Sequence, residues 1–434
     1  MDAVLANTDT AGAVERVFAV ARDRLPGAGK VADARRKAFE AFKRAGLPHR
    51  RIEQWKYTDL RALMREVLPL AAAPDSAALE RARSALAACA IEDAAKLVLI
   101  DGVFAADLSD VAVTGLTVRT LREALEQGGA ELLSSNASDA MISLNAALAT
   151  DGIMVEVADG TALSRAIQII HVATASRSST VTRSQVKLGK AAQARLVESF
   201  VAAEGAKHYQ ANDAVIISVG DGAELSQVRL MADSVDAVNV TSAMLTVGAK
   251  AKVNVFNMTT GGAVSRFQGF VTLAGEGSQL LVGGVNLLKG AQLGDTTLIV
   301  DHAVAECFSR EMFRAVVDER AHSVFQGRII VRPDAQRTDG KMMTRALLLC
   351  DAAEADNKPE LEIFADDVTC GHGATAGALD DNLLFYLRAR GLSEKHAQAL
   401  LIEAFVGEAI ETIADEKLRE LAMAQAERWL GARS

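Results

Sequence analysis

The sequence is poor in aromatic residues, cysteine and positive charge, and each shortage excludes a class of protein. Phe, Trp and Tyr make up 4% of the 434 residues, although 50% of the residues are hydrophobic. The apolar content is mostly Ala, Val and Leu, which suits thin, repetitive layers better than a bulky core. The net charge of −9 argues against a nucleic-acid partner, because non-specific binding to nucleic acid depends on basic patches.

Four cysteines are present, and they contain neither a C-x-x-C pair nor a zinc-finger spacing. They are Cys89, Cys307, Cys350 and Cys370. No apolar run reaches the ~18 residues that cross a bilayer, so no membrane partner is expected. Residues 1–17 lack the basic and apolar regions of an export signal. We therefore expect free thiols in a reducing cytoplasm.

Two common catalytic motifs are also missing. The segment 188–194 resembles a phosphate-binding loop, but it lacks the first glycine and the Ser or Thr that would follow Lys190. No G-x-S-x-G nucleophile motif occurs. The sequence therefore gives no support for α/β-hydrolase chemistry, and any ATP hydrolysis must come from a partner.

The apolar pattern divides the chain into three predicted domains, residues 1–92, 93–375 and 376–434. In the first and last, apolar residues recur at the 3.6-residue spacing of amphipathic helices. In the middle one, short alternating segments bounded by Gly and Asp predict strands and turns. We therefore expect a β core between two helical domains.

One pattern recurs six times in the middle domain. An apolar segment is followed by a residue that suits a turn and, three positions later, by a small residue. The small residues are Ala192, Ala223, Ala251, Gly277, Ala321 and Ala353. Small residues at corners let the coils of a solenoid stack, so that each coil buries the apolar face of the next. The pattern predicts a mainly β chain wound as a parallel β-helix; a β-sandwich is the alternative.

The segment LEIFADDVTCGHGAT, residues 361–375, places Cys370 and His372 two residues apart in a strand-like pattern. Both side chains then face the same way and can share one ligand. Thiolate and imidazole suit iron or zinc, but a closed metal site needs about four ligands. The pair is half of a site completed by another subunit, a catalytic dyad, or a thiol and an imidazole that only pack. Asp366 and Asp367 lie nearby in sequence.

Two other segments are candidates. EQWKYTDL, residues 53–60, holds Trp55 and either docks the helical domain on its neighbour or contacts a ligand. VDHAVAECFSR, residues 300–310, is a titratable cluster that contains His302, Glu306, Cys307 and Arg310.

Residues 327–393, together with EQWKYTDL, resemble the SufB/SufD family of the Suf iron–sulfur cluster assembly machinery. The order of helical domain, solenoid and helical domain also matches, so the resemblance covers essentially the whole chain. B-type members of the family carry a cysteine near the position of Thr344 and Arg345, and a glutamate-rich segment where this chain has CGHGAT. The chain therefore looks like a D-type member.

The resemblance implies a right-handed parallel β-helix and a non-enzymatic scaffold subunit. It implies assembly with a B-type paralogue, SufB, and with an ABC ATPase, SufC; an isolated chain could form a homodimer. His372, with Cys370 beside it, is expected to act in cluster assembly at the interface with the B-type subunit, where iron or a cluster binds transiently at a shared site. The ATPase is expected to bind residues 376–434, with the candidate contacts Phe385, Tyr386, Leu400, Leu401 and Phe405.

Two alternatives remain. A structural solenoid that docks partners and handles no metal shares every feature except a working His372. A carbohydrate-active β-helix enzyme is disfavoured, because such enzymes use exposed aromatic residues and an export signal.

Overall fold

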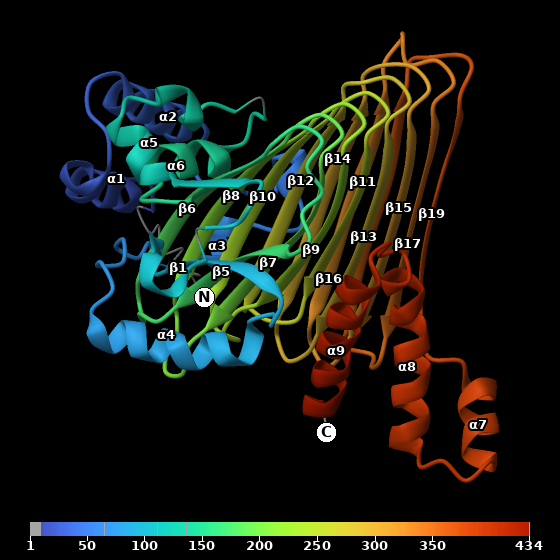
Figure 1. The fold of residues 1–434 in the computed structure, drawn as a ribbon. Coiled ribbons are helices and arrows are strands. Elements are labelled where there is room, and N and C mark those ends of the chain that lie inside the picture. Colours follow the sequence, from blue (N-terminus) through green and yellow to red (C-terminus); the bar gives the residue numbers. More distant parts are fainter. Residues whose placement is uncertain (1–9, 65, 111, 136, 434) are drawn as a thin grey trace.

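The centre of the protein is a solenoid in which the chain passes alternately between two sheets (Figure 1). The computed structural model describes residues 10–433 except 65, 111 and 136; residues 1–9, part of the stretch assessed for an export signal, lie outside the described residues. Sheet 1 contains β1 (Ala94–Ile100), β2 (Val103–Phe104), β5 (Ala166–Ala173), β7 (Gln193–Ala202), β9 (Glu224–Ala232), β11 (Lys252–Thr259), β13 (Gln279–Leu288), β15 (Phe308–Val317), β17 (Asp339–Leu348) and β19 (Thr369–Gly377). Sheet 2 contains β3 (Leu116–Thr120), β4 (Ile153–Val157), β6 (Ser179–Leu188), β8 (Gln210–Val219), β10 (Val238–Val247), β12 (Val264–Leu273), β14 (Leu293–His302), β16 (His322–Val331) and β18 (Glu354–Ile363).

From β4 onward, each strand pairs in parallel with the strand two places further along the chain. Leu245 of β10, for example, lies between Ile217 of β8 and Val271 of β12. The inward side chains of both sheets form one apolar core along the solenoid. The predicted parallel β-helix is confirmed, and the parallel pairing rules out the β-sandwich of antiparallel strands.

The six small residues of the sequence pattern do not all lie at the same kind of corner in the solenoid. Ala192, Ala223 and Ala251 are fully buried where the chain passes from sheet 2 to sheet 1. Ala321 and Ala353 are buried at the opposite corner, where the chain passes from sheet 1 to sheet 2. Two kinds of corner had thus been counted as one series, which explains why the six small residues are unevenly spaced along the chain.

Gly277 is not the small residue of its corner. It adopts a left-handed backbone with φ 69°, and Ser278 behind it is fully buried at the corner position. The turn between β12 and β13 is longer by one residue than the turn that holds Ala251, so the fixed spacing misplaced the corner. Cys307 fills the same position one coil later and is buried.

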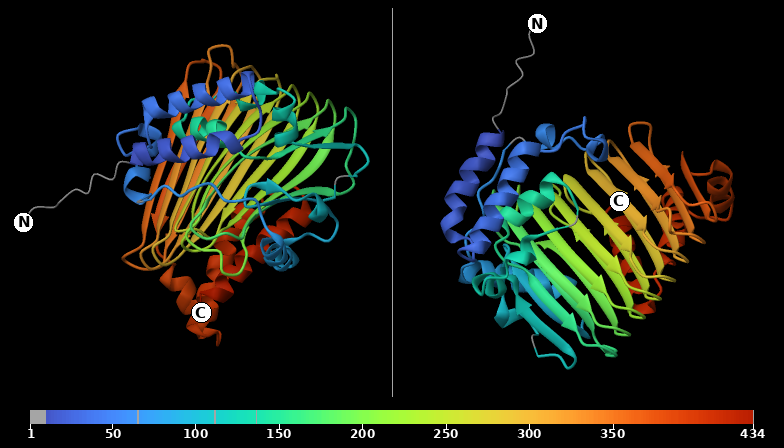
Figure 2. Two further views of the ribbon diagram at one scale, coloured as in Figure 1. Left: turned by 90° about the vertical axis from the view of Figure 1, so that its left-hand side faces the viewer. Right: turned by 90° about the horizontal axis from the view of Figure 1, so that it is seen from above.

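Helices cover the outer faces of both sheets (Figure 2). The amino-terminal layer packs on sheet 2 and includes α1 (Thr10–Ala21), α2 (Lys30–Ala45), α3 (Leu60–Leu63), α5 (Leu121–Glu126) and α6 (Ala140–Leu148), whereas α4 (Ser76–Cys89) packs on sheet 1. At the carboxyl end, α8 (Glu394–Ile410) and α9 (Glu416–Ala432) also pack on sheet 1, and α7 (Asp381–Ala389) extends away from it. None of the helices described is long and apolar enough to cross a bilayer.

The EQWKYTDL segment docks the amino-terminal layer on sheet 2, which favours the first of its two interpretations. Trp55 is 1% exposed, and its Nε1 donates a 2.8 Å hydrogen bond to Asp139 Oδ2. The guanidinium of Arg266, on β12, lies 3.8 Å from the Trp55 ring and also donates to the Gln54 carbonyl at 2.6 Å. Arg266 pairs with buried Asp295 on β14. The aromatic residue therefore covers a buried ion pair.

Candidate functional site at the open end of the solenoid

The last coil, β18 and β19, ends the solenoid with two free strand edges (Figure 1). β18 pairs with β16 and β19 pairs with β17, and neither has a strand on its other side within the described part of the chain. Ile363 and Phe364, at the corner between the two strands, are 41% and 59% exposed. Unpaired edges beside exposed apolar residues are typical of a surface that another strand covers.

Cys370 and His372 both lie on the inward face of β19. They pair with Gly340 and Met342 of β17, and Met342 is part of the solenoid core. Cys370 is half-buried against that core, whereas His372 is exposed because no further coil covers it. The structure therefore brings the two candidate residues to one face, at the end of the solenoid.

The space around the pair is open on one side. A Cβ atom added to Gly371 would have no atom within 4 Å, whereas one added to Gly373 would meet the Met343 side chain. Burial raises the pKa of the Cys370 thiol, and the carboxylates of Asp339 and Glu311 add to the rise. A metal ion would offset both effects, because its positive charge stabilises the thiolate.

Among the residues that the structure describes, no third ligand lies beside this pair. Asp366 and Asp367 lie exposed in the turn before β19. Among the residues described, the one group of three neighbouring His, Cys, Asp or Glu ligands gathers elsewhere. The donor set of one thiol and one imidazole suits iron as a substrate, but the chain alone leaves the site incomplete.

The predicted cluster at residues 300–310 does not form. His302 and Cys307 are buried inside the solenoid, where His302 Nε2 lies 2.9 Å from Ser309 Oγ. Glu306 is on the surface and forms an ion pair with Arg337. Arg310 is directed to the outer face and pairs with Asp339 at 2.7 Å, so the four side chains point to different environments.

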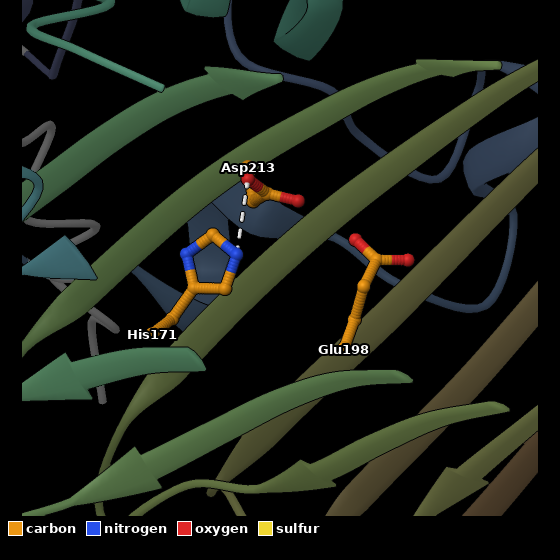
Figure 3. A group of neighbouring side chains, drawn as sticks. All are labelled: His171, Glu198 and Asp213. Carbon is orange, nitrogen blue, oxygen red and sulfur yellow. Dashed lines mark ion pairs between the residues drawn. The ribbon is translucent and has the colours of Figure 1, made fainter. Parts of the chain in front are cut away.

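A polar cluster that the sequence did not predict lies inside the first coils. His171, Glu198 and Asp213 gather there on β5, β7 and β8, as Figure 3 shows. His171 Nε2 lies 3.9 Å from Asp213 Oδ1. Burial lowers the pKa of His171 to about 4, so the imidazole is neutral at physiological pH.

The cation of this cluster is the guanidinium of Arg229. Its Nη2 donates to Glu198 Oε1 at 2.7 Å and lies 3.4 Å from Asp213 Oδ2. Thr182 donates a further hydrogen bond to Asp213 at 2.7 Å. A metal ion would have to displace an arginine that already balances the carboxylates. The cluster is therefore a structural ion network rather than a metal site.

The carboxy-terminal helices expose part of their apolar surface. Phe385 and Tyr386 on α7 are 74% and 55% exposed, and Leu400 on α8 is 46% exposed. Leu401 and Phe405 are partly buried and line a groove of about 450 Å³ between α7, α8, β17 and β19. All five residues proposed to contact the ATPase thus lie on one helical unit, outside the solenoid core.

The comparison with protein families identifies the family of the chain. Residues 171–405 match the model of the SUF system FeS cluster assembly, SufBD core domain, and residues 27–169 match that of the SufBD protein N-terminal region. The chain belongs to the SufBD family. The resemblance seen in the sequence is confirmed, and the two matched regions span both the amino-terminal layer and the solenoid.

Similar proteins carry the same assignment. The chain is 31% identical over 386 residues to the iron–sulfur cluster assembly protein SufD of Escherichia coli, covering 88% of this chain and 89% of that protein. It is 28% identical over 385 residues to an iron–sulfur cluster assembly SufBD family protein of Synechocystis, covering 85% of this chain and 84% of that protein. The chain is thus a homologue of SufD, and these relatives are named as assembly proteins rather than as enzymes.

Proposed function

We propose that this chain is the D-type scaffold subunit of an iron–sulfur cluster assembly complex, which pairs with a SufB-type paralogue and a SufC-type ATPase. The observation that supports this proposal best is the open last coil. A free strand edge and two candidate ligands occur at the same end of the solenoid. The site is built to be completed by another chain.

Pairing at the last coil follows from strand addition. β18 and β19 present unpaired backbone donors and acceptors, and a partner strand satisfies such groups while it covers Ile363 and Phe364. The B-type paralogue is the proposed partner. In its absence, two copies of this chain pair through the same edges to form a homodimer.

Iron is the substrate of the shared site. His372 supplies an exposed imidazole and Cys370 a half-buried thiol, which is two of the roughly four ligands that a cluster requires. The isolated chain therefore holds no cluster stably, and iron or a cluster stays only while the partner contributes the remaining ligands. All four cysteines are free thiols, as the proposed reducing cytoplasm requires.

The ATPase is proposed to bind the carboxy-terminal helices. Phe385 and Tyr386 project from α7, which has no fully buried residue, and the adjoining groove continues along α8. Exposed aromatic residues beside a groove are typical of protein–protein contacts. ATP hydrolysis is assigned to that partner, and this chain is a non-enzymatic subunit.

The test is anaerobic reconstitution of the three-protein complex with parent, His372→Ala or Cys370→Ser. His372 is exposed, so its removal should leave folding and complex formation intact. Cluster absorbance should fall with His372→Ala and fall less with Cys370→Ser, because the half-buried thiol also packs on the core. Parent-level cluster yield from His372→Ala would favour the alternative, a structural solenoid without metal handling.

A further inference from the structure

A carboxylate lies inside the solenoid, two coils behind the open end. Glu311 on β15 is 2% exposed, and neither of its oxygens makes a hydrogen bond of ordinary length among the residues described, although the Ser309 hydroxyl on the same face is near enough to oppose part of the rise in its pKa. It is flanked in register by Val282 and Met342, both of which belong to the apolar core. A buried charge without a partner is very unfavourable, so the group must carry a proton or a cation.

The space around Glu311 suits a proton rather than a metal ion. Burial raises the pKa of Glu311 to about 8. The Ser309 hydroxyl and the charge of Arg310, on the outer face, only partly oppose this shift. His302, across the core, is held neutral because burial lowers its pKa to about 4. Glu311 is therefore mostly a neutral carboxylic acid at physiological pH.

A polar route leads from Glu311 towards the open end. Ser309 lies on the same inward face of β15, and its hydroxyl is 2.9 Å from His302 Nε2. Ser309 lies beside Gly340 of β17 in the strand register, and Gly340 in turn lies beside Cys370 of β19. Two residues further along the same face, Glu311, Met342 and His372 lie side by side in register. The Met342 side chain lies between Glu311 and His372 and prevents direct contact between them.

Gly340 leaves an opening in this route. A methyl group placed on Gly340 would lie 3.4 Å from Ser309 Oγ and 3.6 Å from His302 Nε2, which are ordinary contact distances. The position therefore has room for a side-chain atom that the sequence does not provide. Met342 fills the equivalent space one column away. The Cys370 thiol lies on the far side, close enough to the Gly340 backbone for that backbone to lower its pKa.

We propose that Glu311 is a proton store for the open end, connected to it through the Ser309 hydroxyl and the opening at Gly340. One proton moves and no electron does. The O–H bond of Glu311 breaks, Ser309 accepts that proton and releases its own, and a water or a sulfur atom at the last coil receives it. Glu311 becomes a carboxylate and recovers a proton by the reverse route.

The role of the Glu311 proton in cluster assembly rests on the proposed function. Once a partner covers the last coil, bulk water no longer reaches the site, and sulfur that loses iron when a cluster departs needs a proton from inside. Asp339 and Arg310 lie on the outer face, where they pair with each other. Of the carboxyl groups described near this end, Glu311 is the one that is buried in the core and keeps its proton at neutral pH.

The route is tested on the isolated full-length chain by infrared spectroscopy. The stretching band of a protonated carboxyl group should be present at neutral pH in the parent and absent in Glu311→Gln. In D2O the band shifts as the proton exchanges. Gly340→Ala fills the opening without a clash, and it should slow this exchange about 10-fold or more, a modest part of what a positioned proton carrier contributes.

Matched variants keep the test sharp. Gly371→Ala, on the same end but with nothing nearby, should exchange at the parent rate. Ser309→Ala, which removes the hydroxyl and adds no atom, should slow exchange as Gly340→Ala does, so the test does not depend on whether the methyl group added at Gly340 alters the fold. Parent-rate exchange in both Gly340→Ala and Ser309→Ala overturns the route, and an unchanged band in Glu311→Gln overturns the store.

The reconstituted complex tests the use of the store. Glu311→Gln should slow cluster formation while His372→Ala lowers the yield, and an equal rate for parent and Glu311→Gln overturns the role in assembly. The infrared result does not depend on that outcome. If His372→Ala gives the parent yield and Gly340→Ala still slows exchange, the proposed function fails and the proton route stands.

Discussion

Glu311→Gln should change how the stability of the protein depends on pH. The pKa of Glu311 is about 8 in the folded state and 4.5 in an exposed reference state. Between these values the folded chain binds the proton that the unfolded chain has lost, so the free energy of unfolding falls as pH rises. Each pH unit in this window costs up to about 1.4 kcal/mol, and the whole shift about 4–5 kcal/mol.

The assay is urea unfolding at several pH values between about pH 5 and pH 9. Tryptophan fluorescence reports on both ends of the molecule, because Trp55 is buried in the amino-terminal layer and Trp429 in α9. The parent should lose stability as the pH rises from about 7 to about 8, whereas Glu311→Gln, which cannot ionise, should lack that part of the slope. At lower pH the buried imidazoles of His171 and His302, whose pKa is about 4, oppose the fall in both proteins, so the comparison is made above about pH 7. The glutamine amide is itself buried, so the slopes are compared rather than the absolute stabilities.

Glu276→Gln is the matched control, since Glu276 is exposed in the turn between β12 and β13. It should retain the slope of the parent. The same slope in the parent and in Glu311→Gln would refute the argument that this carboxyl group is held neutral by burial.

Three further outcomes are expected. Trp55→Ala should lower the free energy of unfolding by about 3–5 kcal/mol, because it removes a buried ring and uncovers an ion pair; a urea midpoint close to that of the parent would contradict this. Phe364→Glu should weaken pairing at the last coil, measured by sedimentation of the isolated chain and by capture of the B-type paralogue; undiminished association in both would place the contact elsewhere. Phe385→Ala combined with Tyr386→Ala should reduce co-purification of the ATPase without changing the melting temperature, since both side chains are exposed; full retention of the ATPase would exclude α7 from the contact.

Much of the fold could be predicted because its signals are local. Ala192 and Ala223 mark corners through their small size, and the alternation of the strands between them is visible in the sequence. The prediction of the corner residues failed where turns differ in length, because it counted a fixed number of residues from each strand. A fixed spacing selected Gly277, which supplies a left-handed turn, instead of Ser278, which is buried at the corner.

The candidate site was only partly visible in the sequence. Cys370 and His372 could be placed on one face, because strand periodicity determines relative direction. Glu311 could not be recognised, because in SREMFRAVV a glutamate between Arg310 and Met312 is typical of a surface position. Only the register of β13, β15 and β17 shows that it faces inward. The His171 cluster was missed because its members come from three strands and meet only after the coils stack.

For helix α8, the sequence did not show which face is buried, and the reason is different. α8 is apolar around most of its circumference, so the sequence did not distinguish the buried stripe from the exposed one. In the structure Ile402 and Val406 face sheet 1, whereas Leu400 is turned outward. Of the predicted contact residues on α8, Leu400 lies on the side that the solenoid leaves uncovered, whereas Phe405 packs partly against the cluster that joins α8 to sheet 1.

The contacts of the Trp55 segment indicate the order in which parts of the protein fold. From β4 onward, strands of neighbouring coils come together from about thirty residues apart, and the hydrogen bond from Gln227 to Glu198, for example, joins residues 29 apart in the sequence. The bond from Arg266 to the Gln54 carbonyl, in contrast, joins residues 212 apart in the sequence. The amino-terminal layer is synthesised first, but the Trp55 segment can dock on sheet 2 only after β12 and β14 have formed. Loss of Trp55 should speed unfolding more than it slows folding, because contacts that form last are absent from the transition state.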